Sequence, residues 1–221
     1  MARKFGSGIY GRLEFDFACN RGHGFGEAYL HGVLIELLAS NVNPRSENIL
    51  PSHAVSVLQR EPGGPGRKRE VDFAVAARDD DQELLLCVEA KWAGSSHANA
   101  ENVLYDVARL ALVHQTHPTV SCLFVLAGGK DAVKKLLNSG VLAPHGRGRR
   151  GHQLLRYPHS PHPRRYNLTN GSGHTTALPT NLQTKLAKKV PTVPTRATSF
   201  LYKPTHDDPP DWRVYVWRIE A

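Results

Sequence analysis

Hydrophobic side chains recur along the first 130 residues at spacings that predict both helices and strands. Apolar positions three or four residues apart predict helices over about 27–40 and 97–114. Alternating or continuous apolar runs predict strands over 69–76, 84–92 and 120–127, and the last two are typical of strands covered on both faces. Helices and strands that alternate in this way predict an α/β fold.

Weaker patterns flank these elements. Alternation predicts short strands over 13–17 and 52–59, and the second of these makes the order from residue 27 onward helix, three strands, helix, strand. Near the C-terminus, 199–203 and 212–219 have the β-branched and aromatic character of strands. Residues 181–189, which precede these two strands, predict a short basic helix.

The strands over 69–76 and 84–92 place charged side chains together. If Asp80-Asp81 is the tip of a hairpin, Asp72 lies opposite Glu89 and Glu70 lies opposite Lys91. Because side chains alternate along a strand, Asp72, Glu89 and Lys91 then share one face of the sheet. Two carboxylates about 5 Å apart repel each other, so they call for a cation, and a hard divalent metal prefers such oxygen ligands.

Charge is distributed unevenly along the chain. The formal net charge is +8, yet residues 132–206 contain no Asp or Glu and hold thirteen of the 28 Lys and Arg residues. The remaining chain sums to −5 because it holds all 20 acidic residues. A basic block on an acidic body indicates a polyanionic partner, most simply nucleic acid, and a solvated surface without a partner is the alternative. Candidate contacts are Arg67, Lys68, Arg69, Arg147, Arg149, Arg150, Arg164 and Arg165.

The composition favours a soluble protein of a reducing compartment. The cysteines Cys19, Cys87 and Cys122 show no metal-ligand spacing, and the last two lie in apolar runs typical of buried free thiols. The N-terminus lacks the apolar run of a signal peptide. No stretch approaches the roughly 18 apolar residues of a membrane span. We therefore expect a cytoplasmic protein that does not associate with membranes.

The order of elements, with Asp72 on one strand and Glu89-Ala90-Lys91 near the end of the next, resembles the PD-(D/E)XK nuclease superfamily. The resemblance covers residues 24–130, and Val71 stands where the family name has Pro. It implies a restriction-endonuclease-like αβββαβ core with a mixed central sheet flanked by helices. We expect this core within residues 1–140. Residues 141–221 would form a basic, loop-rich extension with short strands that packs on the core and binds substrate.

The resemblance also implies roles for individual residues. Asp72, Glu89 and the Ala90 carbonyl would hold Mg²⁺, for which Mn²⁺ can substitute, and Lys91 would position the attacking water. Glu27, in the first turn of the first predicted helix, matches an acidic residue that many family members carry there. A polar residue of the second helix often contributes as well, and the sequence does not choose among Asn102, Tyr105, Asp106 and Arg109.

The function implied by the resemblance is a metal-dependent endonuclease, a hydrolase that cleaves phosphodiester bonds of nucleic acid, with DNA expected. A homodimer would suit cleavage of both strands. The rival hypothesis is a catalytically inactive, nuclease-like scaffold that binds nucleic acid or an acidic protein partner. A simpler alternative for the charges is a solvated hairpin in which Lys91 pairs with Glu70.

Two other motifs point elsewhere but match poorly. Gly22, Gly24 and Gly26 precede the first long helix, yet Glu27 stands where a dinucleotide-binding motif needs its last Gly. Six histidines lie within the basic segment without the cysteine partners or spacing of a zinc finger. A nucleotide-dependent enzyme and a zinc site are therefore the less favoured readings.

Overall fold

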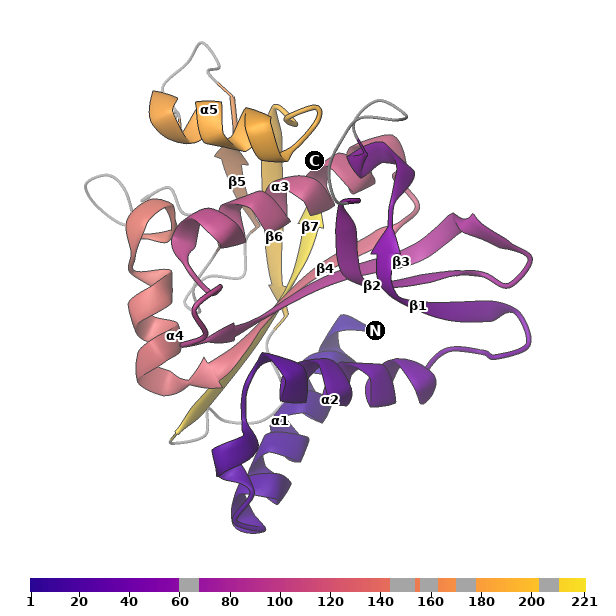
Figure 1. Cartoon of the computed structure of the whole chain (residues 1–221), viewed down its shortest axis with the longest axis vertical. Helices are drawn as coiled ribbons and strands as arrows, with labels where there is room; N and C mark the ends of the chain where they lie inside the picture. Colours follow the sequence, from indigo (N-terminus) through magenta and orange to yellow (C-terminus); the bar gives the residue numbers. More distant parts are fainter. Residues whose placement is uncertain (60–67, 144–153, 156–162, 170–177, 203–210) are drawn as a thin grey trace.

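The structure is a computed structural model that describes residues 1–59, 68–143, 154–155, 163–169, 178–202 and 211–221. In these residues a mixed sheet carries helices on both faces (Figure 1). The helices are α1 (Ala2–Ala18), α2 (Glu27–Ala39), α3 (Ala100–Thr116), α4 (Lys130–Leu137) and α5 (Thr180–Lys189). The strands are β1 (Glu47–Ala54), β2 (Glu70–Ala77), β3 (Asp80–Ala93), β4 (Ser121–Gly129), β5 (Arg164–Asn167), β6 (Arg196–Tyr202) and β7 (Trp212–Glu220).

The strands of the described residues lie in the order β1-β2-β3-β4-β7-β6-β5. Among them, only the neighbours β3 and β4 run parallel, and α3 makes the crossover that a parallel pair requires. The predicted α/β class is confirmed, with a mixed sheet flanked by helices, and from α2 to β4 the elements follow the predicted order. Because β7 pairs along β4, the strands beyond residue 140 extend the same sheet.

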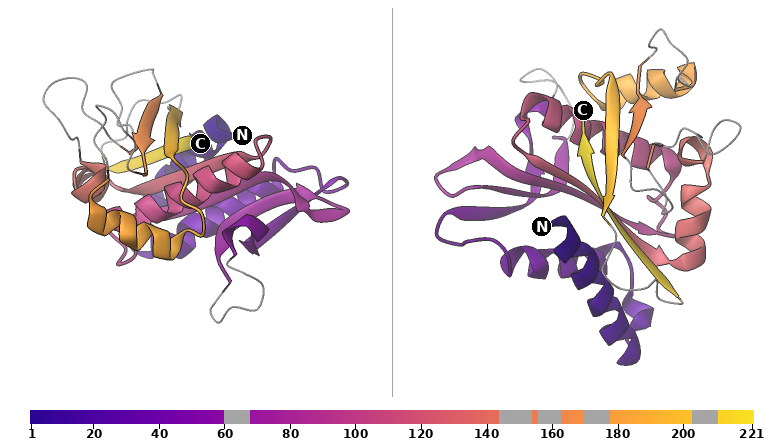
Figure 2. Two further views of the ribbon diagram at one scale, coloured as in Figure 1. Left: turned by 90° about the horizontal axis from the view of Figure 1, so that it is seen from above. Right: turned by 180° about the vertical axis from the view of Figure 1, so that it is seen from behind.

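Two hydrophobic layers cover the sheet, one on each face. On one face, α1 and α2 bury Phe5, Ile9 and Leu34 against the sheet. On the other face, α3 lies across the sheet, where it buries Leu110 against its core, and α5 lies beside α3. Figure 2 shows from two further sides that α1 and α2 are separated from α3 and α5 by the sheet.

The strand predicted over 13–17 is wrong, because these residues form the last turns of α1. Phe5, Ile9 and Leu13 are fully buried and stand four residues apart, which is the spacing of one helix face. Phe15 and Phe17, which suggested alternation, are exposed. The longer helical period therefore decides the structure of this segment.

The strand predicted over 52–59 is correct only in its first part. The observed β1 begins earlier, at Glu47, and ends at Ala54, and a 3₁₀ turn over Ser56–Leu58 follows. Val55 and Leu58 are buried against the core instead of continuing the strand. Because β1 lies at the edge of the sheet, Pro51 within it is tolerated despite its missing N–H donor.

Other sequence predictions hold in the described residues. Cys87 and Cys122 are buried free thiols, as expected, and Cys19 is an exposed one. The basic helix predicted over 181–189 is α5. None of the helices in the described part of the chain has both the length and the apolar character needed to cross a membrane.

Candidate active site

The candidate site begins where the regular pairing of β2 with β3 ends. Phe73 pairs with Val88, so the next positions along both strands are Asp72 and Glu89, as the sequence predicts. At this point the Asp72 carboxylate replaces the ladder, because its Oδ2 accepts the N–H of Ala90 at 2.8 Å. The N–H and carbonyl of a strand residue face the same neighbour, so the Ala90 carbonyl also faces the Asp72 side.

Glu89 is buried and paired with a cation from α3. Its side chain is 1% exposed, and its Oε1 accepts a hydrogen bond from Arg109 Nη2 at 2.7 Å. The same nitrogen of Arg109 donates to Asp106 Oδ1. Thus one guanidinium holds two carboxylates together, one from β3 and one from α3.

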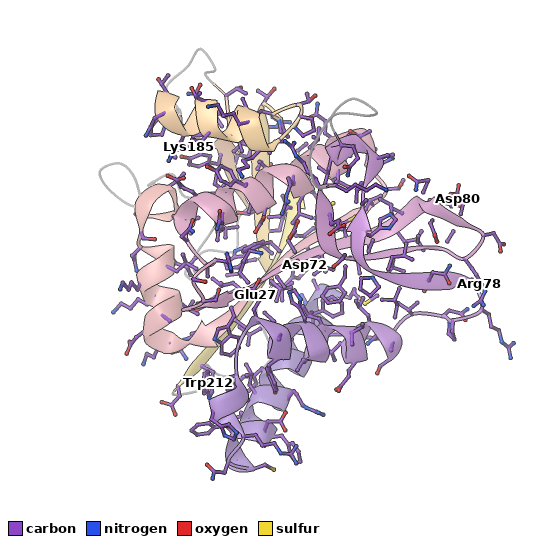
Figure 3. All side chains as sticks on the ribbon, viewed as in Figure 1. Glu27, Asp72, Arg78, Asp80, Lys185 and Trp212 are labelled. Carbon is purple, nitrogen blue, oxygen red and sulfur yellow. The ribbon has the colours of Figure 1, made fainter. Side chains whose placement is uncertain are left out.

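Lys91 lies on the same face of β3 as Glu89 and approaches two acids. Its ammonium lies 3.2 Å from Asp106 Oδ2 and 3.9 Å from Glu27 Oε1. Ser95, which follows β3, donates its hydroxyl to Glu27 Oε2 at 3.1 Å. Figure 3 shows Glu27 and Asp72 close together in the space between α2 and α3. The first turn of α2 therefore contributes its acid to the site, as the sequence predicts.

Burial and like charge make two acids of the site, Glu89 and Asp106, unusually weak. Burial raises the pKa of the Glu89 carboxyl well above its ordinary value, the nearby Asp106 carboxylate raises it further, and Arg109 opposes both. Burial also raises the pKa of Asp106, against the attraction of Lys91 and Arg109. Burial alone would lower the pKa of Lys91, but Asp106 and Asp72 outweigh it and the pKa rises. Lys91 is therefore a permanent cation at neutral pH.

A cavity of about 710 Å³ adjoins these residues, and Glu89, which is buried, is not among the groups that form its floor. Asp72, Lys91, Asp106 and Arg109 all line it. So does Ser52, whose φ of 49° lies in the left-handed region that costs a non-glycine residue about 1–2 kcal/mol. The opening is lined by polar groups of β2, α3 and α5, so the charged floor is accessible to a polar ligand.

The donor set suits a hard divalent cation that keeps part of its water shell. Four carboxylates (Glu27, Asp72, Glu89 and Asp106) surround two cations, which leaves a formal charge of −2. Asp106 Oδ2 is buried and has no hydrogen-bond partner within the described residues, although the Lys91 ammonium lies 3.2 Å away.

No group of three or more His, Cys, Asp or Glu in the described residues forms a ready-made metal cage. Mg²⁺ does not need one, because it binds through one or two carboxylates, waters and substrate phosphates. Asp72, Glu89 and the Ala90 carbonyl therefore fit this ion.

The predicted nucleic-acid contacts divide into two groups. Lys68 and Arg69 line the cavity, while Arg164 and Arg165 lie on β5 at the far edge of the sheet. Arg165 is exposed there. The remaining candidates lie outside the described residues: Arg67, Arg147, Arg149 and Arg150.

Several residues of the site were not selected from the sequence. Of the polar candidates on α3, Asp106 and Arg109 are the ones that contact the predicted trio. Asp106 lies three residues after Val103 and four before Leu110, which are both fully buried. This helical spacing places Asp106 on the buried face of α3 and could have selected it from the sequence. His31 of α2 also approaches, with its Nε2 3.7 Å from Asp72 Oδ2.

Comparison of the chain with protein-family models, curated proteins and solved structures found no match.

Proposed function

We propose that the chain is a metal-dependent nuclease that hydrolyses phosphodiester bonds of nucleic acid, with DNA as the expected substrate. One observation carries the proposal: Asp72, Glu89 and Lys91 meet on one face of β2 and β3, beside a cavity whose opening is basic. The helix, three strands, helix and strand from α2 to β4 support the resemblance to the restriction-endonuclease-like fold.

Asp72, Glu89 and the Ala90 carbonyl would hold the cation. When bound, a divalent cation would polarise the phosphodiester and lower the pKa of a water molecule. Lys91, kept protonated by its acidic neighbours, would orient that water and stabilise the negative charge that develops at phosphorus. Glu27 lies 3.9 Å from the Lys91 ammonium and would keep it pointed into the cavity.

Arg109 and His31 would assist as positioning residues. Arg109 fixes the Glu89 and Asp106 carboxylates relative to each other and lowers their mutual repulsion. The His31 Nε2 accepts and donates no hydrogen bond within the described residues and lies next to Asp72 Oδ2.

The proposal is tested by cleavage of labelled duplex and single-stranded DNA with Mg²⁺, Mn²⁺ or EDTA. Lys91→Ala should abolish metal-dependent cleavage, by at least about 100-fold if its charge stabilises the transition state, and should leave DNA binding nearly unchanged. Lys134→Gln is the matched control, because Lys134 is an exposed residue of α4 that does not line the cavity. Cleavage by Lys91→Ala at the wild-type rate would refute the assignment.

A binding protein without catalysis is the second candidate, and the Glu89–Arg109 pair favours it. In such a scaffold Arg109 permanently neutralises Glu89, and no metal is needed. The melting temperature separates the two hypotheses, because a ligand that binds only the folded state stabilises it. A scaffold should show no rise in melting temperature with Mg²⁺ or Mn²⁺, whereas the nuclease should show one that Asp72→Asn removes.

A further inference from the structure

The cavity has a basic opening built from two distant parts of the chain. Lys68 and Arg69 precede β2, and Lys188 and Lys189 end α5. Lys68, Lys188 and Lys189 are exposed at the surface. The carboxylates of Asp72 and Asp106 line the same cavity, and Asp106 is only 6% exposed, so the lysines lie nearer the surface than this acid. A polyanion that carries a divalent cation matches this pattern: its backbone meets the lysines and its cation meets the acids.

A brace holds the end of α5 across this opening. Arg69 donates a hydrogen bond from Nη2 to the Lys188 carbonyl at 3.0 Å. At the same helix, Lys185 pairs with Glu101 of α3 at 2.8 Å, and Figure 3 shows Lys185 on α5 above α3. The lysines at the end of α5 are thereby fixed next to the catalytic groups, although they are more than 95 residues away from Lys91 in the sequence.

The wall between opening and floor carries aromatic rings. Tyr105 of α3 lines the cavity and is half-buried, and its hydroxyl donates to Glu101 Oε2 at 3.2 Å. This hydrogen bond holds the ring in place from its outer end. His97, which precedes α3, is exposed and lines the same cavity. A groove that combines cations for phosphates with aromatic rings for bases is the pattern by which proteins bind single strands.

The depth of the floor discriminates between single strands and duplex. The Lys91 side chain is 11% exposed and that of Asp106 is 6% exposed, so the reacting phosphate must descend into the cavity to reach them. A cavity of about 710 Å³ lies in the range that encloses a drug-sized ligand. A nucleotide or two of a single strand fits this space, whereas a base-paired duplex is too wide to enter.

We infer that the cavity takes single-stranded DNA, an inference that rests on the proposed function. Phosphates contact Lys68, Lys188 and Lys189, Arg69 acts mainly as the brace, and an unstacked base lies on the ring of Tyr105. The substrate class is therefore a single strand, or a frayed or unpaired end, rather than an intact duplex.

Binding is measured without cleavage, by fluorescence anisotropy of a labelled mixed-sequence DNA strand and its duplex in EDTA, over a series of salt concentrations. Wild type should bind the strand at least about fivefold more tightly than the duplex, as one stacked base supplies. Lys188→Gln with Lys189→Gln should reduce the salt slope by about 1.4, since each phosphate contact of a single strand contributes about 0.7. Lys134→Gln with Lys135→Gln, two exposed lysines of α4, should leave the slope unchanged.

The role of the ring is tested with Tyr105→Ala and Tyr105→Phe. Loss of one stacked base should weaken strand binding about 5- to 150-fold in the Ala variant, while the Phe variant keeps the ring and should bind like wild type. Equal or tighter binding of duplex would overturn the inference, and so would an unchanged salt slope in the double lysine variant. Strand-selective binding without any metal-dependent cleavage would support the inference and reject the proposed nuclease. Metal-dependent cleavage confined to duplex would support the proposed nuclease and reject the inference of a single-stranded substrate.

Discussion

The Glu89–Arg109 pair allows the electrostatics of the site to be tested through stability. Arg109→Gln removes the guanidinium and leaves Glu89, 1% exposed, without its paired cation, while Lys91 stays next to Asp106. Removing one partner of a buried ion pair costs about 3–5 kcal/mol. In a chain of this size each kcal/mol lowers the melting temperature by about 2–4 °C, so we expect a decrease of about 6–20 °C.

The matched control is the ion pair between Lys185 and Glu101, whose side chains are 51% and 43% exposed. Lys185→Gln should cost about 0–1 kcal/mol, as exposed ion pairs do, and should lower the melting temperature by less than about 4 °C. Arg109→Lys keeps the charge but not the guanidinium whose Nη2 contacts both carboxylates, so its decrease should fall between the two.

Differential scanning fluorimetry at neutral pH in low salt measures all three variants. Mg²⁺ should recover part of the stability that Arg109→Gln loses, because a divalent cation supplies the missing positive charge. If Arg109→Gln and Lys185→Gln lower the melting temperature by the same amount, Glu89 is not a buried anion held by Arg109. The account of the site as a charge cluster would then fail.

Two further predictions concern pH and backbone packing. The pKa values of Glu89 and Asp106 are raised in the folded state. At pH values above the ordinary carboxyl pKa range, the folded chain therefore binds more protons than the unfolded chain. The stability of the metal-free protein should fall as the pH rises through the raised pKa values. Because a cation competes with those protons, the Mg²⁺-induced rise in melting temperature should grow from about pH 5 to about pH 8, and a rise that shrinks with pH would contradict this. Gly128→Ala should destabilise the sheet by about 1–3 kcal/mol, because its φ is +154° and a Cβ would lie 2.9 Å from the Ala93 carbonyl oxygen. Gly129→Ala, where a Cβ meets nothing within 4 Å, is the control in the same denaturation experiment.

The sequence predicted the part of the site that depends on local strand geometry. Asp72, Glu89 and Lys91 follow from a two-residue alternation and one hairpin register, and both rules act over short distances. The predicted hairpin tip at Asp80-Asp81 is wrong, because Ala77 pairs with Asp80 and the turn lies at Arg78-Asp79. Register shifts between Val75 and Ala77 restore the predicted pairing by Phe73 and Val88.

Residues contributed by long-range packing could not be selected in the same way. The place of Lys188 above the site depends on how α5 packs on α3 and on the brace from Arg69, which spans 119 residues. The wrong strand prediction around Phe15 of α1 has a different cause. Alternation over only five residues fits a strand and the edge of a helix equally well. A periodic pattern of apolar residues distinguishes a strand from a helix only when it repeats over enough residues.

The burial of one face of β3 explains why the site lies where it does. Cys87, Glu89 and Lys91 point to the same face, and their exposure rises from none for Cys87 to 1% and then 11% for the two charged side chains as α3 stops covering the strand. A carboxylate at position 89 is costly, because burial of charge is unfavourable unless it is compensated. An apolar side chain would stabilise the sheet there as well or better. The chain instead keeps Glu89 and supplies Arg109 to hold it. Stability alone does not account for that combination, whereas the metal-binding role that we propose for Glu89 does.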